Sequence, residues 1–136
     1  MKFVKLHHDA ILPTRQTDGA AGYDLHCVGS HTIRSLTKVP TGVGIQIPKE
    51  WVGLIRDRSG LAANFGLTTL AGVIDCDYTG EINVIMSCVL GEGAQIWNGD
   101  RIAQLIIVPA LMEDSEWADT TITTARGGRG FGSTGK

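Results

Sequence analysis

Glycine interrupts this chain of 136 residues at 18 positions, which are spread along its whole length. Few stretches between the glycines are long and periodic enough to predict a helix of ordinary length. Short strands joined by tight turns need fewer residues, and glycine supplies the positive φ that many such turns require. The sequence therefore predicts one all-β domain over residues 1–136.

Four apolar segments carry the strand pattern. Residues 43–47 read VGIQI, with an apolar side chain at every second position, and Pro48 ends the pattern because proline cannot donate to a ladder. Further strands are predicted over residues 51–55, 81–90 and 101–108. The segment 81–90 is apolar on both faces, so we expect a second sheet or a neighbouring subunit to cover it.

One short helix is predicted from Ser59, which is expected to cap it, to Gly66, which is expected to end it. Arg58 offers a forked cation, Ser59 a hydroxyl and Gly60 an accessible backbone. At the amino end of a helix, these groups form a candidate phosphate site. A surface charge cluster over residues 56–58, with an ordinary serine cap, explains the segment equally well.

Residues 72–80, GVIDCDYTG, place Asp75 and Asp77 in a turn between apolar strands. A carboxylate at such a turn can orient a water as a general base. An aspartate beside glycine more often bonds to the backbone of its own turn, and this segment alone favours that structural role.

The charge balance limits the partners. The formal net charge is −2 and the sequence pI is about 6.0, so we expect no nucleic acid partner, because such a surface needs clustered cations. A small anion in one cationic pocket remains compatible with these values. The first ten residues are charged rather than apolar, so we expect no membrane span and a cytoplasmic protein, or a nuclear one if the source is eukaryotic.

Metal-binding residue types occur without a metal-site pattern. The three cysteines, Cys27, Cys76 and Cys88, show no metal spacing and are expected to be reduced thiols. The run His7, His8, Asp9 lacks further ligands at a useful spacing and is interpreted as a solvated strand edge.

Residues 126–136, RGGRGFGSTGK, contain three cations and no acid. They predict either a frayed tail or a glycine-rich flap that an anion orders.

Taken together, five segments resemble the five motifs of the trimeric dUTPase family, in family order and over nearly the whole chain. They are LPTRQTDGAAGYDL (12–25), RSGLA (58–62), GVIDCDYTGE (72–81), GDRIAQL (99–105) and RGGRGFGSTG (126–135). The resemblance implies a jelly-roll-like β-clip barrel with one short helix and a flexible C-terminal arm over residues 126–136. It also implies a homotrimer in which different subunits build each site.

The reaction that the resemblance implies is hydrolysis of dUTP to dUMP and pyrophosphate, which limits uracil in DNA and supplies dUMP for dTMP synthesis. Asp75 would orient the attacking water in line with the α-phosphorus, and Asp24 would hold a water bound to Mg²⁺. The implied phosphate contacts are Arg58, Ser59, Gly60, Gln104, Arg126 and Ser133. Uracil would contact Val73, Ile74, Asn83 and Phe131, and the deoxyribose Tyr78, with Thr69 near the base. Gly72 and Gly132 are further substrate-binding residues that the resemblance implies.

The fifth segment departs from the family pattern, because Arg129 stands where most family tails have a second fixed glycine. Arginine there either strains a positive φ or adds a phosphate contact. Two other functions are compatible with the resemblance: a relative of the same fold that acts on dCTP, and a regulatory trimer that binds dUTP as a ligand. The Ile74–Asp75 pair and the 58–60 run favour the dUTP-directed enzyme over the first.

Overall fold

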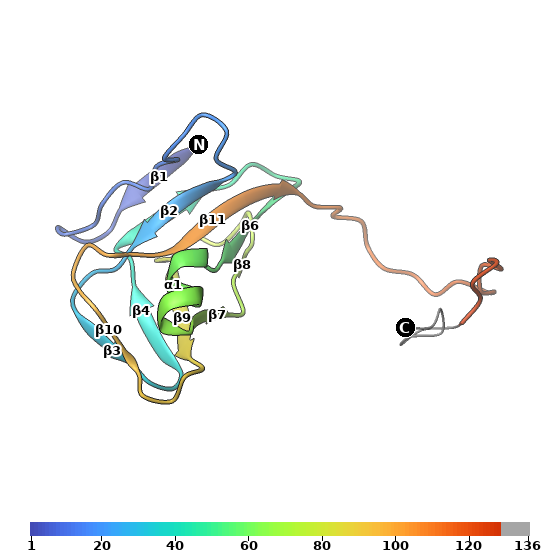
Figure 1. The fold of residues 1–136 in the computed structure, drawn as a ribbon. Helices are drawn as coiled ribbons and strands as arrows, with labels where there is room; N and C mark the ends of the chain where they lie inside the picture. The colour runs from blue at the N-terminus through green and yellow to red at the C-terminus, as the bar shows by residue number, and fades with distance from the viewer. Residues whose placement is uncertain (129–136) are drawn as a thin grey trace.

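The computed structural model describes residues 1–128, which form short strands and one helix (Figure 1). The strands are β1 (Lys2–Lys5), β2 (Gly22–His26), β3 (His31–Ile33), β4 (Thr37–Pro40), β5 (Val43–Gln46), β6 (Trp51–Arg56), β7 (Leu67–Leu70), β8 (Val73–Ile74), β9 (Asn83–Cys88), β10 (Ala94–Ile96) and β11 (Arg101–Pro109). The helix is α1 (Ser59–Phe65).

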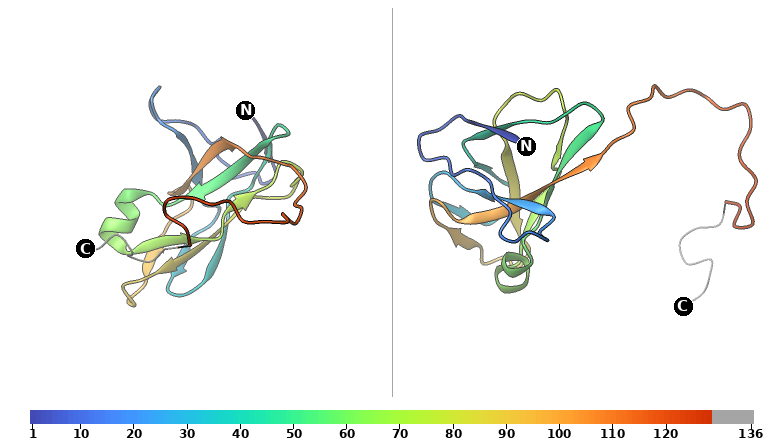
Figure 2. Two further views of the ribbon diagram at one scale, coloured as in Figure 1. Left: turned by 90° about the vertical axis from the view of Figure 1, so that its right-hand side faces the viewer. Right: turned by 90° about the horizontal axis from the view of Figure 1, so that it is seen from above.

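The strands pair in four antiparallel sheets. The largest has the order β2-β11-β6-β8, the next β4-β9-β7, and two pairs, β1-β5 and β10-β3, complete the set. The sheets curl around one core, and α1 lies against the outside of the body (Figures 1 and 2). This arrangement confirms the predicted all-β, jelly-roll-like fold with one short helix.

The core is built from the alternate positions of these strands. Its least exposed side chains come from β2, β3, β4, β9, β10 and β11 and from the residue before β9: Leu25, Ile33, Val39, Ile82, Val84, Met86, Ile96, Ile102 and Leu105. The predicted alternation in residues 43–47 is confirmed, because Val43, Ile45 and Ile47 are buried while Gln46 is exposed. The three cysteines are free, as predicted.

Strand β9 is shorter than the predicted 81–90 segment and is buried on one face. At its start, the Glu81 carbonyl accepts hydrogen bonds from side chains, and beyond its end Val89 donates to the Gly66 carbonyl. The side chain of Ile85 is half-buried and that of Val89 is 71% exposed. No second sheet of the described chain covers this face fully, so its cover by a neighbouring subunit stays a prediction.

The predicted serine cap on α1 is wrong. The N-cap is Arg58, with extended backbone angles and no side-chain capping bond, and Ser59 is the first helical residue. Arg58 takes this position because its carbonyl accepts the first helical hydrogen bonds, from the N–H groups of Leu61 and Ala62. The predicted stop is confirmed: Gly66 has φ +61° and closes the helix on Ala62.

After β11 the chain forms no further strand or helix within residues 110–128 and runs away from the body (Figures 1 and 2). Trp117 and Ile122 in this segment are 100% and 90% exposed. The predicted arm, residues 126–136, falls mostly outside the described residues, and its flexibility stays a prediction. No helix formed by residues 1–128 is long and apolar enough to cross a membrane.

Candidate active site

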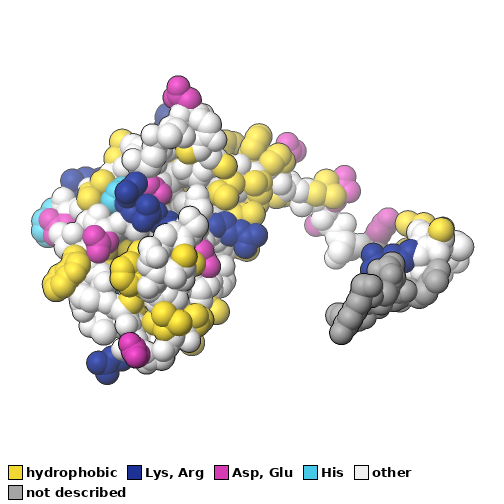
Figure 3. Space-filling view, in the orientation of Figure 1, with side chains coloured by type: hydrophobic (Ala, Val, Ile, Leu, Met, Phe, Trp, Pro, Cys, Tyr) yellow, Lys and Arg dark blue, Asp and Glu magenta, His cyan; other side chains and the backbone are white. Residues whose placement is uncertain are grey.

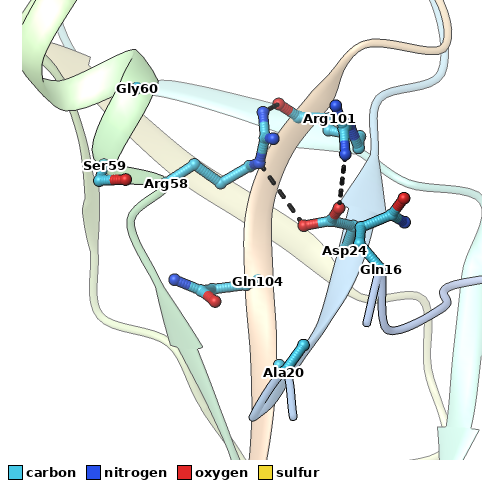
Figure 4. Close-up of a pocket in the computed structure, with 9 residues that line it drawn as sticks. Gln16, Ala20, Asp24, Arg58, Ser59, Gly60, Arg101 and Gln104 are labelled. Atoms are coloured by element: carbon cyan, nitrogen blue, oxygen red, sulfur yellow. Dashed lines mark hydrogen bonds and ion pairs between the residues drawn. The ribbon is translucent and has the colours of Figure 1, made fainter. Parts of the chain in front are cut away.

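A cationic pocket lies between β2, β11 and the amino end of α1 (Figure 4). We call it the cationic pocket; its lining residues are Gln16, Ala20, Gly22, Asp24, Arg58, Ser59, Gly60, Arg101 and Gln104. The space-filling view shows Lys and Arg side chains gathered on this face of the body, near β2 and the start of β11 (Figure 3). The pocket has the chemistry of an anion site, because two guanidinium groups outnumber its one carboxylate.

Asp24 organises the two cations of the pocket. Its carboxylate lies 3.1 Å from Nη1 of Arg101 and 3.5 Å from Nε of Arg58, and its residue is 8% exposed. Arg58 also donates from Nη1 to the Arg101 carbonyl at 2.9 Å. These contacts fix both guanidinium groups before any ligand arrives, which lowers the cost of ordering them on an anion.

Gln104 enters the same pocket in one orientation. Its Nε2 donates to the Asp57 carbonyl at 2.8 Å, which leaves Oε1 directed toward Gly22. A Cβ on Gly22 would lie 2.8 Å from Oε1 and 3.0 Å from Cβ of Gln104. Glycine at position 22 is therefore needed because the Gln104 side chain occupies the space of a larger residue.

Asp57 lies beside the pocket and is held by two threonines. Its carboxylate accepts bonds from Oγ1 of Thr68 at 3.0 Å and from N and Oγ1 of Thr69, both at 2.6 Å. Burial acts to raise the pKa of Asp57, but the hydrogen bonds from Thr69 and Thr68 and the charge of Arg56 outweigh it, and the pKa lies below its ordinary value.

His26 extends the charged face of β2 beyond Asp24. Its Nδ1 is buried without a hydrogen-bond partner. Burial lowers the pKa of His26, and the charge of Asp24 opposes this shift while Arg101 and Arg58 add to it. The imidazole is therefore held toward its neutral form and adds no strong positive charge to the site.

A second pocket, the Asp75 pocket, lies where β8 ends. Its lining residues are Lys38, Val73, Ile74, Asp75, Tyr78, Glu81 and Asn83. The Glu81 carbonyl accepts bonds from the Tyr78 hydroxyl at 2.8 Å and from Nδ2 of Asn83 at 3.2 Å. The carboxylate of Asp75 is exposed in the turn that its carbonyl closes with the Tyr78 N–H, so a water can reach it.

The two pockets lie at opposite edges of the four-stranded sheet. Asp24 is on β2 and Asp75 follows β8, with β11 and β6 between them. Across the sheet Asp24 aligns with Gln104 and Arg56, whereas Ile74 aligns with Gly53. Three strand spacings and a three-residue offset along the strands put Asp24 and Ile74 roughly 17 Å apart across the sheet. One chain therefore does not bring the two groups of residues together.

The structure divides the predicted site residues between these pockets. Asp24, Arg58, Ser59, Gly60 and Gln104 line the cationic pocket, and Val73, Ile74, Asp75, Tyr78 and Asn83 line the Asp75 pocket. Thr69 and Gly72 line neither of the two. Arg126 lies in the extended segment beyond the body, and Phe131, Gly132, Ser133 and Arg129 lie outside the described residues.

The sequence analysis assigns no role to seven residues that the structure places in or beside the pockets: Gln16, Ala20, Gly22, Lys38, Asp57, Glu81 and Arg101. Arg101 lies within the fourth motif and directly precedes the buried residues Ile102 and Ala103, so the motif is the signal that could identify it. In the sequence, Asp57 belongs only to the alternative in which residues 56–58 form a surface charge cluster. Its contacts with Thr68 and Thr69 depend on strand pairing, which local sequence does not reveal.

The cationic pocket fits a hydrated magnesium ion that a ligand also holds. Mg²⁺ in proteins is bound by one or two carboxylates and keeps several waters, and Asp24 is the one carboxylate among the lining residues. Because two guanidinium groups already flank it, this carboxylate suits a metal-bound water better than the ion itself. Elsewhere in residues 1–128, His7, His8 and Asp9 gather their potential ligand atoms within 4.8 Å, but the His7 Nδ1 already accepts the Asp9 N–H.

Known proteins are similar to this chain in sequence and in fold. The sequence model of the dUTPase family matches residues 8–135. The deoxyuridine 5'-triphosphate nucleotidohydrolase of Paramecium bursaria Chlorella virus 1 is 43% identical over 133 residues, which cover 96% of this chain and 94% of that protein.

Two solved structures show the same fold. A mutant dUTPase of Staphylococcus bacteriophage 80alpha with dUpNHpp has a TM-score of 0.90 and 25% identity, over 99% of this chain and 98% of that one. A mutant dUTPase of the S. aureus phage phi11, reported for its coordination of a structural Mg(II) ion, has a TM-score of 0.79 and 24% identity, over 88% and 96% of the chains. The family match spans nearly the whole sequence, and the chain belongs to the dUTPase family.

Proposed function

We propose that this chain hydrolyses dUTP to dUMP and pyrophosphate, at sites that subunits of a homotrimer share. Family membership supports the substrate, and the phage relative with a TM-score of 0.90 binds the dUTP analogue dUpNHpp. The observation that carries the shared site is the separation of the two pockets. A base that acts through one water must lie within hydrogen-bond reach of that water beside the α-phosphorus. In one chain, Asp24 of the cationic pocket and Ile74 of the Asp75 pocket lie roughly 17 Å apart across the sheet.

In the proposed reaction, the Asp75 carboxylate orients a water toward the α-phosphorus. The water oxygen forms the new P–O bond, its proton passes toward Asp75, and pyrophosphate leaves on the opposite side. Phosphoryl transfer depends mainly on positioning and charge stabilisation. Arg58, Ser59, Gly60 and Gln104 of another subunit supply both, since Asp24 and Asp57 hold Arg58 and Gln104 in fixed orientations.

Arg101 is added to the proposed phosphate contacts. It lines the cationic pocket beside Arg58 and shares the Asp24 carboxylate with it. A triphosphate that approaches the pocket can bind both guanidinium groups while they keep contact with Asp24. Arg126 and Ser133 of the arm are proposed to reach the outer phosphates, as the family resemblance implies.

Magnesium is proposed as the cofactor, and the phi11 relative with its structural Mg(II) ion supports the choice. Asp24 would hold a water of the hydrated ion. When bound, the ion neutralises charge on the phosphate oxygens. In its absence the two guanidinium groups still bind phosphate, so we expect weaker binding after chelation rather than none.

The Asp75 pocket is proposed to select the deoxyuridine. Backbone groups of Val73 and Ile74 and the amide of Asn83 face a space in which a wrong pattern of donors and acceptors stays unpaired, at a cost of about 1–3 kcal/mol for each group. Tyr78 is held by its hydroxyl bond to Glu81 and would pack under the sugar, where a 2′-hydroxyl needs room. The roles in uracil exclusion and dUMP supply, and the cytoplasmic or nuclear location, follow as proposals from the same family.

The first test is pyrophosphate release from dUTP, dCTP, dTTP and UTP, with Mg²⁺ and after chelation. Release from dUTP alone supports the proposal, and equal rates with dCTP would replace it with the dCTP-directed alternative. Asp75→Asn should abolish turnover while dUpNHpp still binds. Asp77→Asn is the matched control, since Asp77 lies in the same turn, is exposed and lines neither pocket.

A complementation experiment tests the shared site. Asp75→Asn disables one pocket and Arg58→Ala the other, so each variant alone should be inactive. Co-expression of the two chains should restore part of the activity, because some sites then combine two intact pockets. Activity that stays absent in mixed trimers of confirmed composition contradicts a site built from both pockets of different chains.

A further inference from the structure

Asp57 is tied more strongly to its surroundings than an exposed turn aspartate. Its carboxylate accepts three hydrogen bonds from Thr68 and Thr69, two of them at 2.6 Å, and its carbonyl accepts the Gln104 amide at 2.8 Å. One residue therefore connects β7, the loop that leads into α1, and β11.

The connection acts on groups that line the cationic pocket. Asp57 precedes Arg58, Ser59 and Gly60 in the chain, so anchoring its side chain on β7 also anchors the start of this run. The bond to its carbonyl consumes one N–H of Gln104 and selects one of the two amide orientations. The second N–H of Gln104 remains as a donor for an anion in the pocket.

The same contacts indicate the role of Thr69. Both its backbone N–H and its hydroxyl donate to one carboxylate oxygen of Asp57, and Thr69 does not line the cationic pocket or the Asp75 pocket. A hydroxyl engaged in a 2.6 Å bond to a carboxylate is a poor candidate for a direct bond to a nucleotide.

We propose that Asp57 is a positioning residue for the triphosphate, which sets the Gln104 amide and the 58–60 run, and that Thr69 acts through Asp57 rather than on the nucleotide. The inference rests on the proposed function, because it assigns the ligand of the cationic pocket as a triphosphate. It concerns geometry and not charge, since the negative charge of Asp57 by itself opposes anion binding.

Binding of two nucleotides to the folded protein tests this role. dUpNHpp engages all the phosphate contacts, whereas dUMP engages few of them, and neither is turned over. For Asp57→Ala we expect about tenfold weaker binding of dUpNHpp, the size of one lost hydrogen bond to a charged group, with dUMP affinity unchanged. Equal losses for both ligands, or a loss for neither, would overturn the proposal.

The conservative variant separates positioning from charge. Asparagine at position 57 keeps a side-chain oxygen that accepts from Thr69 and has an amide N–H that the Thr68 hydroxyl can accept. The backbone carbonyl that accepts from Gln104 is present in every variant. Asp57→Asn should therefore retain dUpNHpp affinity within about threefold. If charge were the cause, Asp57→Asn would bind dUpNHpp more tightly than the wild type. If Asp57→Ala fails to fold, Asp57→Asn and Thr69→Val are compared instead. The positioning role then requires that Thr69→Val bind dUpNHpp more weakly than Asp57→Asn does.

A double-mutant cycle tests the route through Asp57. Thr69→Val should weaken dUpNHpp binding in the wild type and have no further effect in Asp57→Ala, because neighbours in one network are not additive. Additive losses would show that Thr69 touches the nucleotide itself. Thr32→Val is the matched control: it removes a hydroxyl bond of 2.7 Å to Gln95 on another sheet and should leave binding unchanged.

The outcomes also separate this inference from the proposed function. A wild-type protein that neither binds dUpNHpp nor hydrolyses dUTP contradicts the proposed function. A wild-type protein that does both, with Asp57→Ala and Thr69→Val indistinguishable from it, contradicts only the positioning role.

Discussion

Gly22→Ala tests whether Gln104 must occupy its observed position. The new Cβ would lie 2.8 Å from Oε1 and 3.0 Å from Cβ of Gln104. Because Oε1 and Cδ lie where the new methyl would stand, the Gln104 side chain has to leave its rotamer. The contact with the Gln104 Cβ, which the backbone fixes, is relieved only by a small shift of β2 against β11. Gln104 then loses its bond to the Asp57 carbonyl and, in the proposed complex, its bond to a phosphate.

The expected loss of activity follows from the hydrogen bond that Gln104 would no longer make to a phosphate. A hydrogen bond to a charged group contributes about 1.5–3 kcal/mol, so kcat/KM for dUTP should fall by roughly 10- to 150-fold. Stability changes less, because the lost bond to Asp57 contributes only about 1 kcal/mol and alanine reduces the entropy of the unfolded chain. We expect Tm to shift by no more than about 5 °C.

Steady-state kinetics with dUTP, alongside thermal unfolding, measure both quantities. Gly19→Ala is the matched control in the loop that leads into β2, since a Cβ there meets nothing within 4 Å and Gly19 has no positive φ. The reasoning is refuted if Gly22→Ala keeps wild-type kcat/KM, or if Gly19→Ala loses as much. It is also refuted if Gly22→Ala loses activity only in proportion to an unfolded fraction.

Three further predictions concern other parts of the site. Gly60→Ala should raise Tm slightly, because alanine favours the helix by up to about 1 kcal/mol and its Cβ has open space. The affinity for dUpNHpp should nevertheless fall, and an unchanged affinity would mean that no phosphate approaches the Gly60 backbone. Asp57 has a pKa below its ordinary value of 3.8, so its stabilising contribution is full above pH 3.8 and is lost as pH falls through the lowered pKa. The difference in unfolding free energy between wild type and Asp57→Asn should therefore narrow in acid, and a gap that widens there contradicts the hydrogen-bonding account. Tyr78→Ala should raise kcat/KM for UTP relative to dUTP by about tenfold or more, whereas an unchanged ratio assigns sugar selection to another residue.

The elements that the sequence predicted well are those whose pattern is local. The alternation over residues 43–47 and the glycine at the end of α1 each depend on a few neighbouring residues, and both are confirmed. The resemblance then predicted the fold and the family without any pairing of strands being known. The resemblance rests on five motifs that follow one another in the family's order along the chain, and such motifs can be recognised without knowing which strands pair.

The errors and omissions concern contacts that cross the sheet. The N-cap is Arg58 instead of Ser59, and the Arg58 side chain contacts Asp24 and the Arg101 carbonyl, 34 and 43 residues away. Asp57 looked like part of a surface charge cluster, since its partners Thr68 and Thr69 are identified only by the return of β7. Local sequence propensities describe only residues close together in the chain, so they do not predict contacts between residues this far apart in sequence.

The separation of the pockets also explains the pattern of exposure on a single chain. The groups expected to bind phosphate are fixed by long-range bonds, whereas the Asp75 carboxylate lies exposed in a short turn. Strand β9, which starts beside that turn, leaves Val89 and Leu90 beyond its end 71% and 62% exposed. Burying such side chains contributes about 25 cal/mol for each Å² of apolar surface. A subunit that covers Val89 and Leu90 in the proposed trimer would gain this free energy in addition to completing a site.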